Sequence, residues 1–303
     1  MEKTLKPIIE KVHAREILDS RGFPTVEVEI TASGHKSVSA VPSGASTGEF
    51  EALELRDGDT QRFHGKGVLK AVDNVINNFG PALIGKDASH QKEIDDLLIN
   101  IDGTSNKSTF GANASLGISM ACSVASAAFY NKPLYHYLNP NSSIMPIPMI
   151  NVLNGGMHAD QGSDLQEIML FPHGAKNFNH SVQMGSEVFH YLKKELKKQG
   201  LGTTVGDEGG FAPALKSNDH AIDLLLNSIE KAGFNIGNDI SLALDVAASS
   251  FYKDHKYHLK VDGSVLNTDG MIGFYEDVIQ KYPIVSIEDG LDENDWEGWA
   301  NMN

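Results

Sequence analysis

The sequence predicts two domains of different class, an α+β domain followed by an α/β domain. The first forty residues alternate as half-buried strands do, and helical periodicity then continues to about residue 129. Beyond residue 141, short apolar strands alternate with amphipathic helices, which is typical of a parallel sheet that is either open or closed into a barrel. We therefore expect one domain over residues 1–140 and a second over residues 141–303.

The first domain is expected to open with an antiparallel meander. Val26, Val28 and Ile30 alternate with polar residues, which is the pattern of a strand with one buried face. Ser33 and Gly34 then predict a turn into the next strand. Helical periodicity follows over residues 66–79, 90–100 and 113–129.

The second domain is expected to alternate between strands and helices. The predicted strands cover residues 147–153, 165–171, 241–247 and 284–288, and the predicted helices cover residues 178–199, 217–232 and 270–281. Gly200, after Lys197 and Lys198, predicts a helix end with cations at the negative end of its dipole.

Composition excludes several classes of function. The chain has 25 Lys and Arg residues against 40 Asp and Glu residues, a formal charge of −15, which argues against a nucleic-acid surface and against binding to anionic membranes. The single cysteine, Cys122, has no partner for an internal disulfide and is expected to pack in a helix. The N-terminus lacks a signal-peptide core, and the apolar stretch 116–130 is too short to span a bilayer, so we expect a cytoplasmic protein.

Two predicted strands end in carboxylates. Asp245 and Glu288 each close an apolar run, and the C-terminal ends of barrel strands are where side chains that do chemistry gather. Hard oxygen ligands of this kind suit Mg²⁺, which keeps positions open for substrate oxygens. Alternatively, each is a strand-end residue that meets solvent or pairs with a cation, but the pair together with the other motifs favours a site.

A third carboxylate, Glu208, lies in the motif of residues 205–213, VGDEGGFAP. Glycines on either side permit backbone conformations closed to other residues and let a ligand come close. A simple turn is the alternative, but the whole motif is more specific than a turn. We therefore expect Glu208 to transfer a proton.

Three further segments carry candidate binding residues. Residues 43–48, SGASTG, could move as a lid whose hydroxyl and N–H groups contact a phosphate or its metal, or could be a flexible surface loop. His158 follows the run NVLNGGM and is either a donor to an anionic substrate or a structural histidine. Gln166 and Glu167 are adjacent, so on a strand only one would reach the site unless the strand ends there.

Taken together and in this order, these segments resemble enolase (phosphopyruvate hydratase) of the bacterial type. The resemblance extends from the run AREILDSRG at residues 14–22 to Asp295 and Trp296, nearly the whole chain. It implies an α+β N-terminal capping domain and a TIM-like β/α barrel.

The resemblance also implies a function: the reversible dehydration of 2-phosphoglycerate to phosphoenolpyruvate in glycolysis and gluconeogenesis by a cytoplasmic, Mg²⁺-dependent hydro-lyase with two Mg²⁺ ions. Family members are commonly dimers, so a homo-oligomer is expected. The roles implied are metal binding for Asp245, Glu288 and Ser43, proton transfer for Glu208 and Glu167, and substrate contact for His158, Gln166 and Glu167.

The barrel is expected to be incomplete in this chain. Residues 142–303 number 162, whereas a (β/α)₈ barrel takes about 250. The family's third metal carboxylate and the Lys that abstracts the C2 proton have no counterpart before Asn303. A catalytically inactive enolase-like chain that acts as a binding protein, including at the cell surface, is therefore the alternative function. A racemase or epimerase of the same superfamily is disfavoured, because Gln166 and Glu167 stand where those enzymes place Lys-x-Lys.

Overall fold

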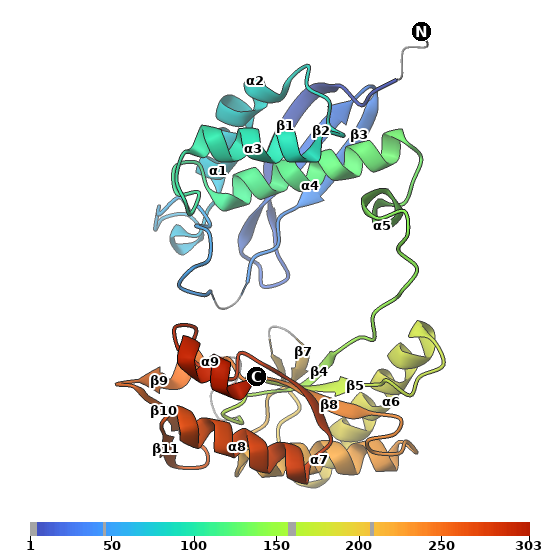
Figure 1. The fold of residues 1–303 in the computed structure, drawn as a ribbon, viewed down its shortest axis with the longest axis vertical. Helices are drawn as coiled ribbons and strands as arrows, with labels where there is room; N and C mark the ends of the chain where they lie inside the picture. The colour runs from blue at the N-terminus through green and yellow to red at the C-terminus, as the bar shows by residue number, and fades with distance from the viewer. Residues whose placement is uncertain (1–4, 45–46, 157–161, 207–208) are drawn as a thin grey trace. The chain divides into compact units, whose positions relative to one another are not determined.

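The chain forms two compact units, Met1–Ile144 and Met145–Asn303, in a computed structural model that describes residues 5–44, 47–156, 162–206 and 209–303 (Figure 1). Each unit has its own hydrophobic core.

Unit 1 begins with the expected antiparallel meander. Its strands are β1 (Ile9–Leu18), β2 (Pro24–Ala32) and β3 (His35–Ala40), in the order β1-β2-β3. The helical elements that follow are η1 (Phe63–Gly65), α1 (Leu69–Asp73), the π-helical η2 (Asn74–Phe79), α2 (Gly80–Leu83), α3 (Gln91–Asp102), α4 (Ala112–Phe129) and α5 (Leu134–Leu138). The three helical stretches predicted for this part of the chain are thus confirmed.

Helix α4 packs on β2 and β3, and α3 packs against α4 (Figure 1). The small residues of α4 allow a close approach, since a Cβ on Gly117 would lie only 2.6 Å from Val28 Cγ2. By length and composition α4 is also a candidate membrane span, but half of its 18-residue window is buried inside the unit. Its packing on β2 and β3 is that of a core helix.

Unit 2 contains a six-stranded sheet with helices packed against it. Its strands lie in the order β12-β8-β5-β4-β7-β6. They are β4 (Ile150–Asn154), β5 (Glu167–Phe171), β6 (Val205–Gly206), β7 (Gly209–Phe211), β8 (Ser241–Asp245) and β12 (Ile284–Glu288). The longer helices are α6 (Phe178–Lys198), α7 (Asn218–Lys231) and α8 (Thr268–Lys281), with α9 (Trp296–Met302) after β12.

The expectation of a wholly parallel sheet is wrong for β5. This strand is antiparallel to both β4 and β8, whereas β8 and β12 are parallel. A parallel neighbour of β4 would need a crossover of a dozen or more residues, usually a helix. The short segment between β4 and β5 joins two strands that pair directly with each other, with Asn154 opposite Glu167. Glu167 therefore begins its strand instead of ending it.

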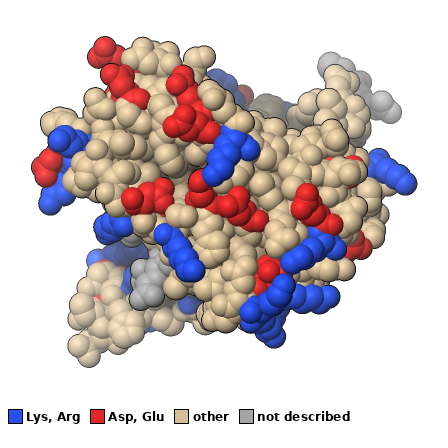
Figure 2. Space-filling model, turned by 90° about the horizontal axis from the view of Figure 1, so that it is seen from below, with Lys and Arg blue, Asp and Glu red and all other residues tan. Residues whose placement is uncertain are grey.

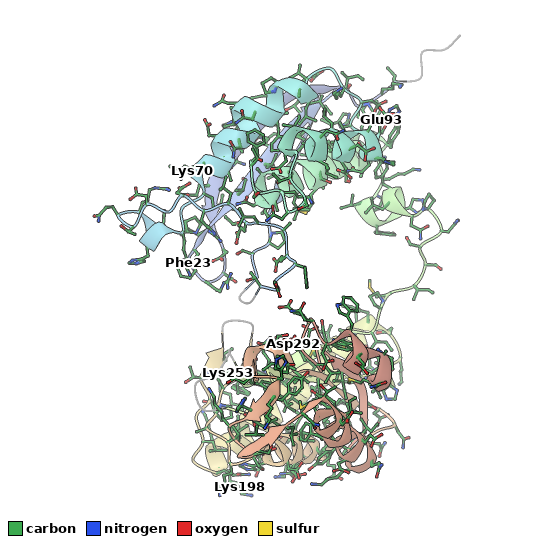
Figure 3. All side chains as sticks on the ribbon, turned by 60° about the vertical axis from the view of Figure 1, so that its left-hand side comes forward. Phe23, Lys70, Glu93, Lys198, Lys253 and Asp292 are labelled. Carbon is green, nitrogen blue, oxygen red and sulfur yellow. The ribbon has the colours of Figure 1, made fainter. Side chains whose placement is uncertain are left out.

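The helices of unit 2 start where side chains cap them. Asn177, Ser217 and Asn267 each accept a hydrogen bond from the backbone N–H three residues later, at the starts of α6, α7 and α8. Gly200 has φ +71° just after α6, which confirms the predicted helix end. Figure 3 shows Lys198, the last residue of α6, at the opposite end of unit 2 from Asp292, in the loop after β12.

The periodicity did not predict the small sheet that follows β8. After η4 (Ala248–Phe251) come β9 (Tyr252–Lys253), β10 (Lys256–Leu259) and β11 (Ser264–Leu266), which are antiparallel. Tyr257 is fully buried, and its hydroxyl accepts a hydrogen bond from Asp292 N–H at 2.9 Å. These strands are too short to give a clear alternating pattern.

Candidate active site

Three carboxylates form a row across three neighbouring strands of unit 2. Glu167 on β5 is the register partner of Asp245 on β8, and Asp245 is the register partner of Glu288 on β12. Register partners point to the same face of a sheet, with Cβ atoms about 4.5–5.5 Å apart. The row joins the start of β5 to the ends of β8 and β12, because β5 runs in the opposite direction.

Gln166 lies beside the row and is buried, with 4% of its surface exposed. Its Nε2 donates to Asp245 Oδ2 at 3.2 Å. The residue precedes β5, so the alternation of side chains along a strand does not turn it away from the row. Its Oε1 is buried and has no hydrogen-bond partner among the described residues, which leaves one acceptor for a ligand.

The loops after β8 and β12 hold each other in strained conformations. Ala247 and Asp289 both have φ +48°. Val246 N–H donates to the Glu288 carbonyl at 3.0 Å, and Ala248 N–H donates to the Asp289 carbonyl at 2.9 Å. Left-handed conformations of non-glycine residues occur disproportionately at functional sites.

Negative charge accumulates at this rim. Partial burial of the Glu288 carboxylate raises its pKa, and the negative charges of Asp245 and Asp289 raise the pKa further. Like charges this close oppose one another's ionisation. The row would therefore be stabilised by a cation.

The end of β4 makes close contacts with the segment before β5 and with β7. Gly155 N–H donates to the Gln166 carbonyl, and a Cβ on Gly155 would come closer than 3.0 Å to the Ser163 and Leu165 carbonyl oxygens. Asn154, 1% exposed, donates from Nδ2 to the Gly209 carbonyl and, at 3.1 Å, to the Gly210 carbonyl. The motifs of residues 151–158 and 205–213 are thus adjacent in space.

Sequence reasoning did not identify Asn154 as a site residue, and the only signal for it was its place inside the motif of residues 151–158. Its role depends on a contact 56 residues away, with Gly210. His158 and Glu208, the other predicted residues of these two motifs, lie outside the described residues.

Ser43 belongs to unit 1, where its hydroxyl is fully engaged. It donates to Glu54 Oε2 at 3.1 Å and accepts from Arg56 Nη2 at 3.2 Å. Arg21 donates to the carbonyls of Ser43 and Gly44, both at 3.0 Å. The base of the predicted lid is therefore fixed by two arginines.

The chemistry of the row fits Mg²⁺. Its donors are hard oxygens, as this ion prefers, and the pKa of Glu288 is raised by negative charges that a cation would compensate. In the described part of the chain no three His, Cys, Asp or Glu residues are grouped as a metal site. The carboxylates alone would supply only part of a coordination shell, and the remaining ligands would come from substrate, solvent or other residues.

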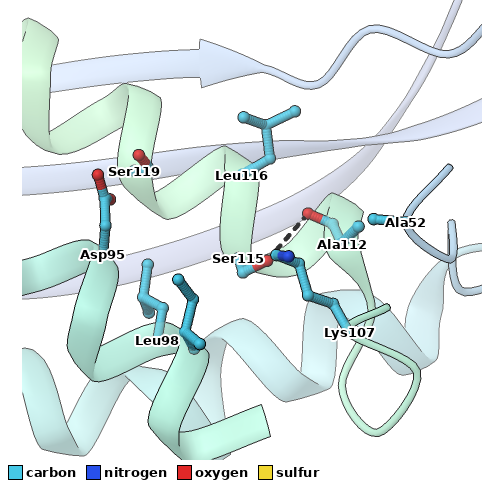
Figure 4. Close-up of a pocket in the computed structure, with 9 residues that line it drawn as sticks. Ala52, Asp95, Leu98, Lys107, Ala112, Ser115, Leu116 and Ser119 are labelled. Atoms are coloured by element: carbon cyan, nitrogen blue, oxygen red, sulfur yellow. Dashed lines mark hydrogen bonds between the residues drawn. The ribbon is translucent and has the colours of Figure 1, made fainter. Parts of the chain in front are cut away.

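A cavity of about 310 Å³ in unit 1 is bordered by α3 and α4, and Figure 4 shows Leu98, Leu116 and Asp95 lining it. It contains none of the predicted site residues. On the face shown in Figure 2, acidic and basic side chains are interspersed.

Comparison with known proteins agrees with the motifs and the fold. The family model "Enolase, N-terminal domain" matches residues 9–138, and "Enolase, C-terminal TIM barrel domain" matches residues 142–303. An enolase of Natranaerobius thermophilus is 54% identical over 297 residues, which are 97% of this chain and 69% of that protein. Both family models and this relative show that the chain belongs to the enolase family, a family of hydro-lyases.

Proposed function

We propose that this chain supplies the carboxylate row of a Mg²⁺-dependent site for the reversible dehydration of 2-phosphoglycerate to phosphoenolpyruvate in the cytoplasm. The observation that supports this most is the register of Glu167, Asp245 and Glu288, three oxygen donors on adjacent strands. The family membership supports the same reaction.

In this proposal Asp245 and Glu288 hold a first Mg²⁺, and Ser43 joins a second. When bound, Mg²⁺ stabilises the negative charge that develops as a proton is removed beside the substrate carboxylate. Ser43 would first have to exchange its contacts with Glu54 and Arg56 for the new ligand.

The remaining residues bind substrate and move protons. Glu208, with Glu167, protonates the hydroxyl that leaves C3, and His158 and Gln166 contact the substrate. The buried Oε1 of Gln166 supports its role, because a substrate hydroxyl could supply the donor that this atom lacks among the described residues. Positioned proton donors and acceptors typically contribute about 10²–10⁴-fold to rate.

The purified chain should be assayed for phosphoenolpyruvate formation by ultraviolet absorbance, with Mg²⁺ and with EDTA. Assayed together with the family's C-terminal segment, which carries the Lys base, the chain should show turnover that EDTA abolishes, and about 100-fold slower turnover in the variants Asp245→Asn and Glu288→Gln. Asp277→Asn, an exposed carboxylate on α8, is the matched control and should leave the rate unchanged.

Two results would contradict this proposal. Turnover that survives both EDTA and Asp245→Asn would place the reaction elsewhere. No turnover, with a macromolecular partner still bound, would favour the role of a binding protein instead.

A further inference from the structure

The side-chain amide of Asn218 has all its hydrogen-bonding capacity satisfied inside unit 2. Asn218 is the first residue of α7 and only 2% exposed. Its Oδ1 accepts from Ser163 Oγ at 2.7 Å and from Asp164 N–H at 2.8 Å. Its Nδ2 donates to Asp164 Oδ2 at 3.1 Å and to Asp262 Oδ2 at 2.7 Å. Two donors and two acceptor positions are all that a carboxamide offers.

These contacts join three segments that are distant in sequence. Asp164 lies just before β5, Asn218 starts α7, and Asp262 lies in the turn between β10 and β11. Asp164 also accepts from Val261 N–H at 3.1 Å, and Asp262 accepts from Asn218 N–H at 3.1 Å. We call Asp164, Asn218 and Asp262 the Asn218 clamp.

The Asn218 clamp holds two carboxylates on one amide. Asp164 is buried, at 7% exposed, and a buried carboxylate is costly unless hydrogen bonds satisfy it. Apolar residues of similar volume would often stabilise a fold equally well. Unlike apolar packing, the hydrogen bonds of the clamp are directional, so they fix the position of the segment 163–167.

That segment leads directly to the carboxylate row. Leu165 is fully buried, and Gln166 follows it with its carbonyl held by Gly155 N–H at 2.9 Å. Gly156 N–H donates to the Ser163 carbonyl at 2.8 Å. Between the clamp and the contact of Gln166 with Asp245, the chain therefore has little freedom to shift.

We infer that Asn218 is a positioning residue, which sets the place of the segment 163–167 and thereby of the Gln166 amide against Asp245. This inference rests on the proposed function in one respect, that Gln166 and Asp245 belong to the site. Residues that orient metal ligands from outside the coordination shell typically change metal affinity by about 10–100-fold when mutated.

The test uses Asn218→Asp, which keeps the shape of the side chain but turns its donors into an acceptor facing two carboxylates. Ser217→Ala is the matched control, because Ser217 Oγ caps the same helix by accepting from His220 N–H at 3.1 Å. Ser217→Ala weakens the start of α7 and leaves the clamp intact, whereas Asn218→Asp breaks the clamp and leaves the cap in place. Asp262→Ala, on the exposed turn, is a milder second variant if Asn218→Asp does not fold.

Two measurements follow on the full chain: hydrogen exchange of the Gly155 amide, and the dissociation constant of Mg²⁺ by calorimetry. We expect Asn218→Asp to speed that exchange and to weaken Mg²⁺ binding, each about tenfold, with a smaller change in the same direction for Asp262→Ala. Ser217→Ala should change neither by more than about twofold, although it lowers the melting temperature.

A reversed pair supplies the rescue. Combining Asn218→Asp with Asp164→Asn exchanges donor and acceptor across their contact, so part of the protection of Gly155 should return. Equal exchange in Asn218→Asp and Ser217→Ala would overturn the inference. If the unchanged chain shows no Mg²⁺ binding that Asp245→Asn removes, the proposed function fails, and the exchange of Gly155 still decides the role of Asn218.

Discussion

Gly155 is the residue on which the approach between the end of β4 and the start of β5 depends. A methyl group there would meet two backbone carbonyl oxygens, those of Ser163 and Leu165, and backbone cannot move aside as a flexible side chain can. The site therefore requires glycine at this position for steric reasons.

Gly155→Ala should lower the free energy of unfolding by about 1–3 kcal/mol, the usual cost of overpacking. Gly273→Ala is the matched control, because nothing lies within 4 Å of the new methyl group in α8, and alanine favours a helix over glycine by about 0.5–1 kcal/mol. Urea unfolding of both variants measures the difference. Equal stability of the two variants would show that the backbone opens at little cost.

Cys122 illustrates burial of a titratable residue away from the site. It is fully buried in α4, as expected from its small apolar neighbours, and burial with the negative charge of Asp95 raises the pKa of its thiol to about 12. The thiolate is the reactive form. We expect no reaction with Ellman's reagent at pH 8 in the folded chain and one equivalent in guanidinium chloride. Rapid labelling of the folded chain would contradict the packing of α4.

At the scale of elements, Asp102 ties the end of α3 to the segment before α4. Its carboxylate accepts from Thr104 N–H at 3.1 Å and from Phe110 N–H at 2.8 Å, and from the Thr104 hydroxyl. Burial acts to raise the pKa of Asp102, but these hydrogen bonds outweigh it and the pKa is lowered.

A lowered pKa in the folded state has a definite consequence for stability. The contribution of Asp102 is complete above its unfolded pKa of about 3.9 and is lost as the pH falls through the folded pKa. Asp102→Asn should therefore cost about 1–2 kcal/mol at pH 7 and less at pH 3. Unfolding by urea at both pH values measures this, with the exposed Asp96→Asn as control. A cost independent of pH would show that the charge is not involved.

The bounds of the helices were predictable from the sequence, whereas the direction of a strand in its sheet was not. The starts and ends of α6, α7 and α8 follow from caps and periodicity, which are local signals. The predicted direction of β5 was wrong, because an apolar run has the same appearance in a parallel and an antiparallel sheet. That direction is what places Gln166 and Glu167 at the rim.

At the scale of the whole molecule, β12 lies at one edge of the six-stranded sheet in unit 2, and β6 lies at the other. Within the described residues it pairs only with β8, and Val285 on it is 54% exposed. An edge strand with apolar side chains is a template for association with another chain. Such association is in line with the homo-oligomer that the family resemblance led us to expect.

Val285→Lys should weaken self-association, because a charged residue on an edge strand opposes pairing. Val265→Lys is the matched control, since Val265 is also 54% exposed but lies on β11 of the small sheet. Sedimentation velocity over a range of concentrations would reveal the shift to smaller species. The same shift in both variants would mean that added charge alone, and not the edge of β12, is responsible.

The sequence by itself determined the two fold classes, most helices, the family and the residue types of the candidate site. Periodicity, caps and motifs are local, so they can be read from neighbouring residues. Only the tertiary structure decided that Glu167, Asp245 and Glu288 form one row, that Gln166 contacts Asp245, and that Asn218 joins Asp164 to Asp262. These relations connect residues 43 to 79 positions apart, and pairing and register over such distances depend on how the whole chain packs.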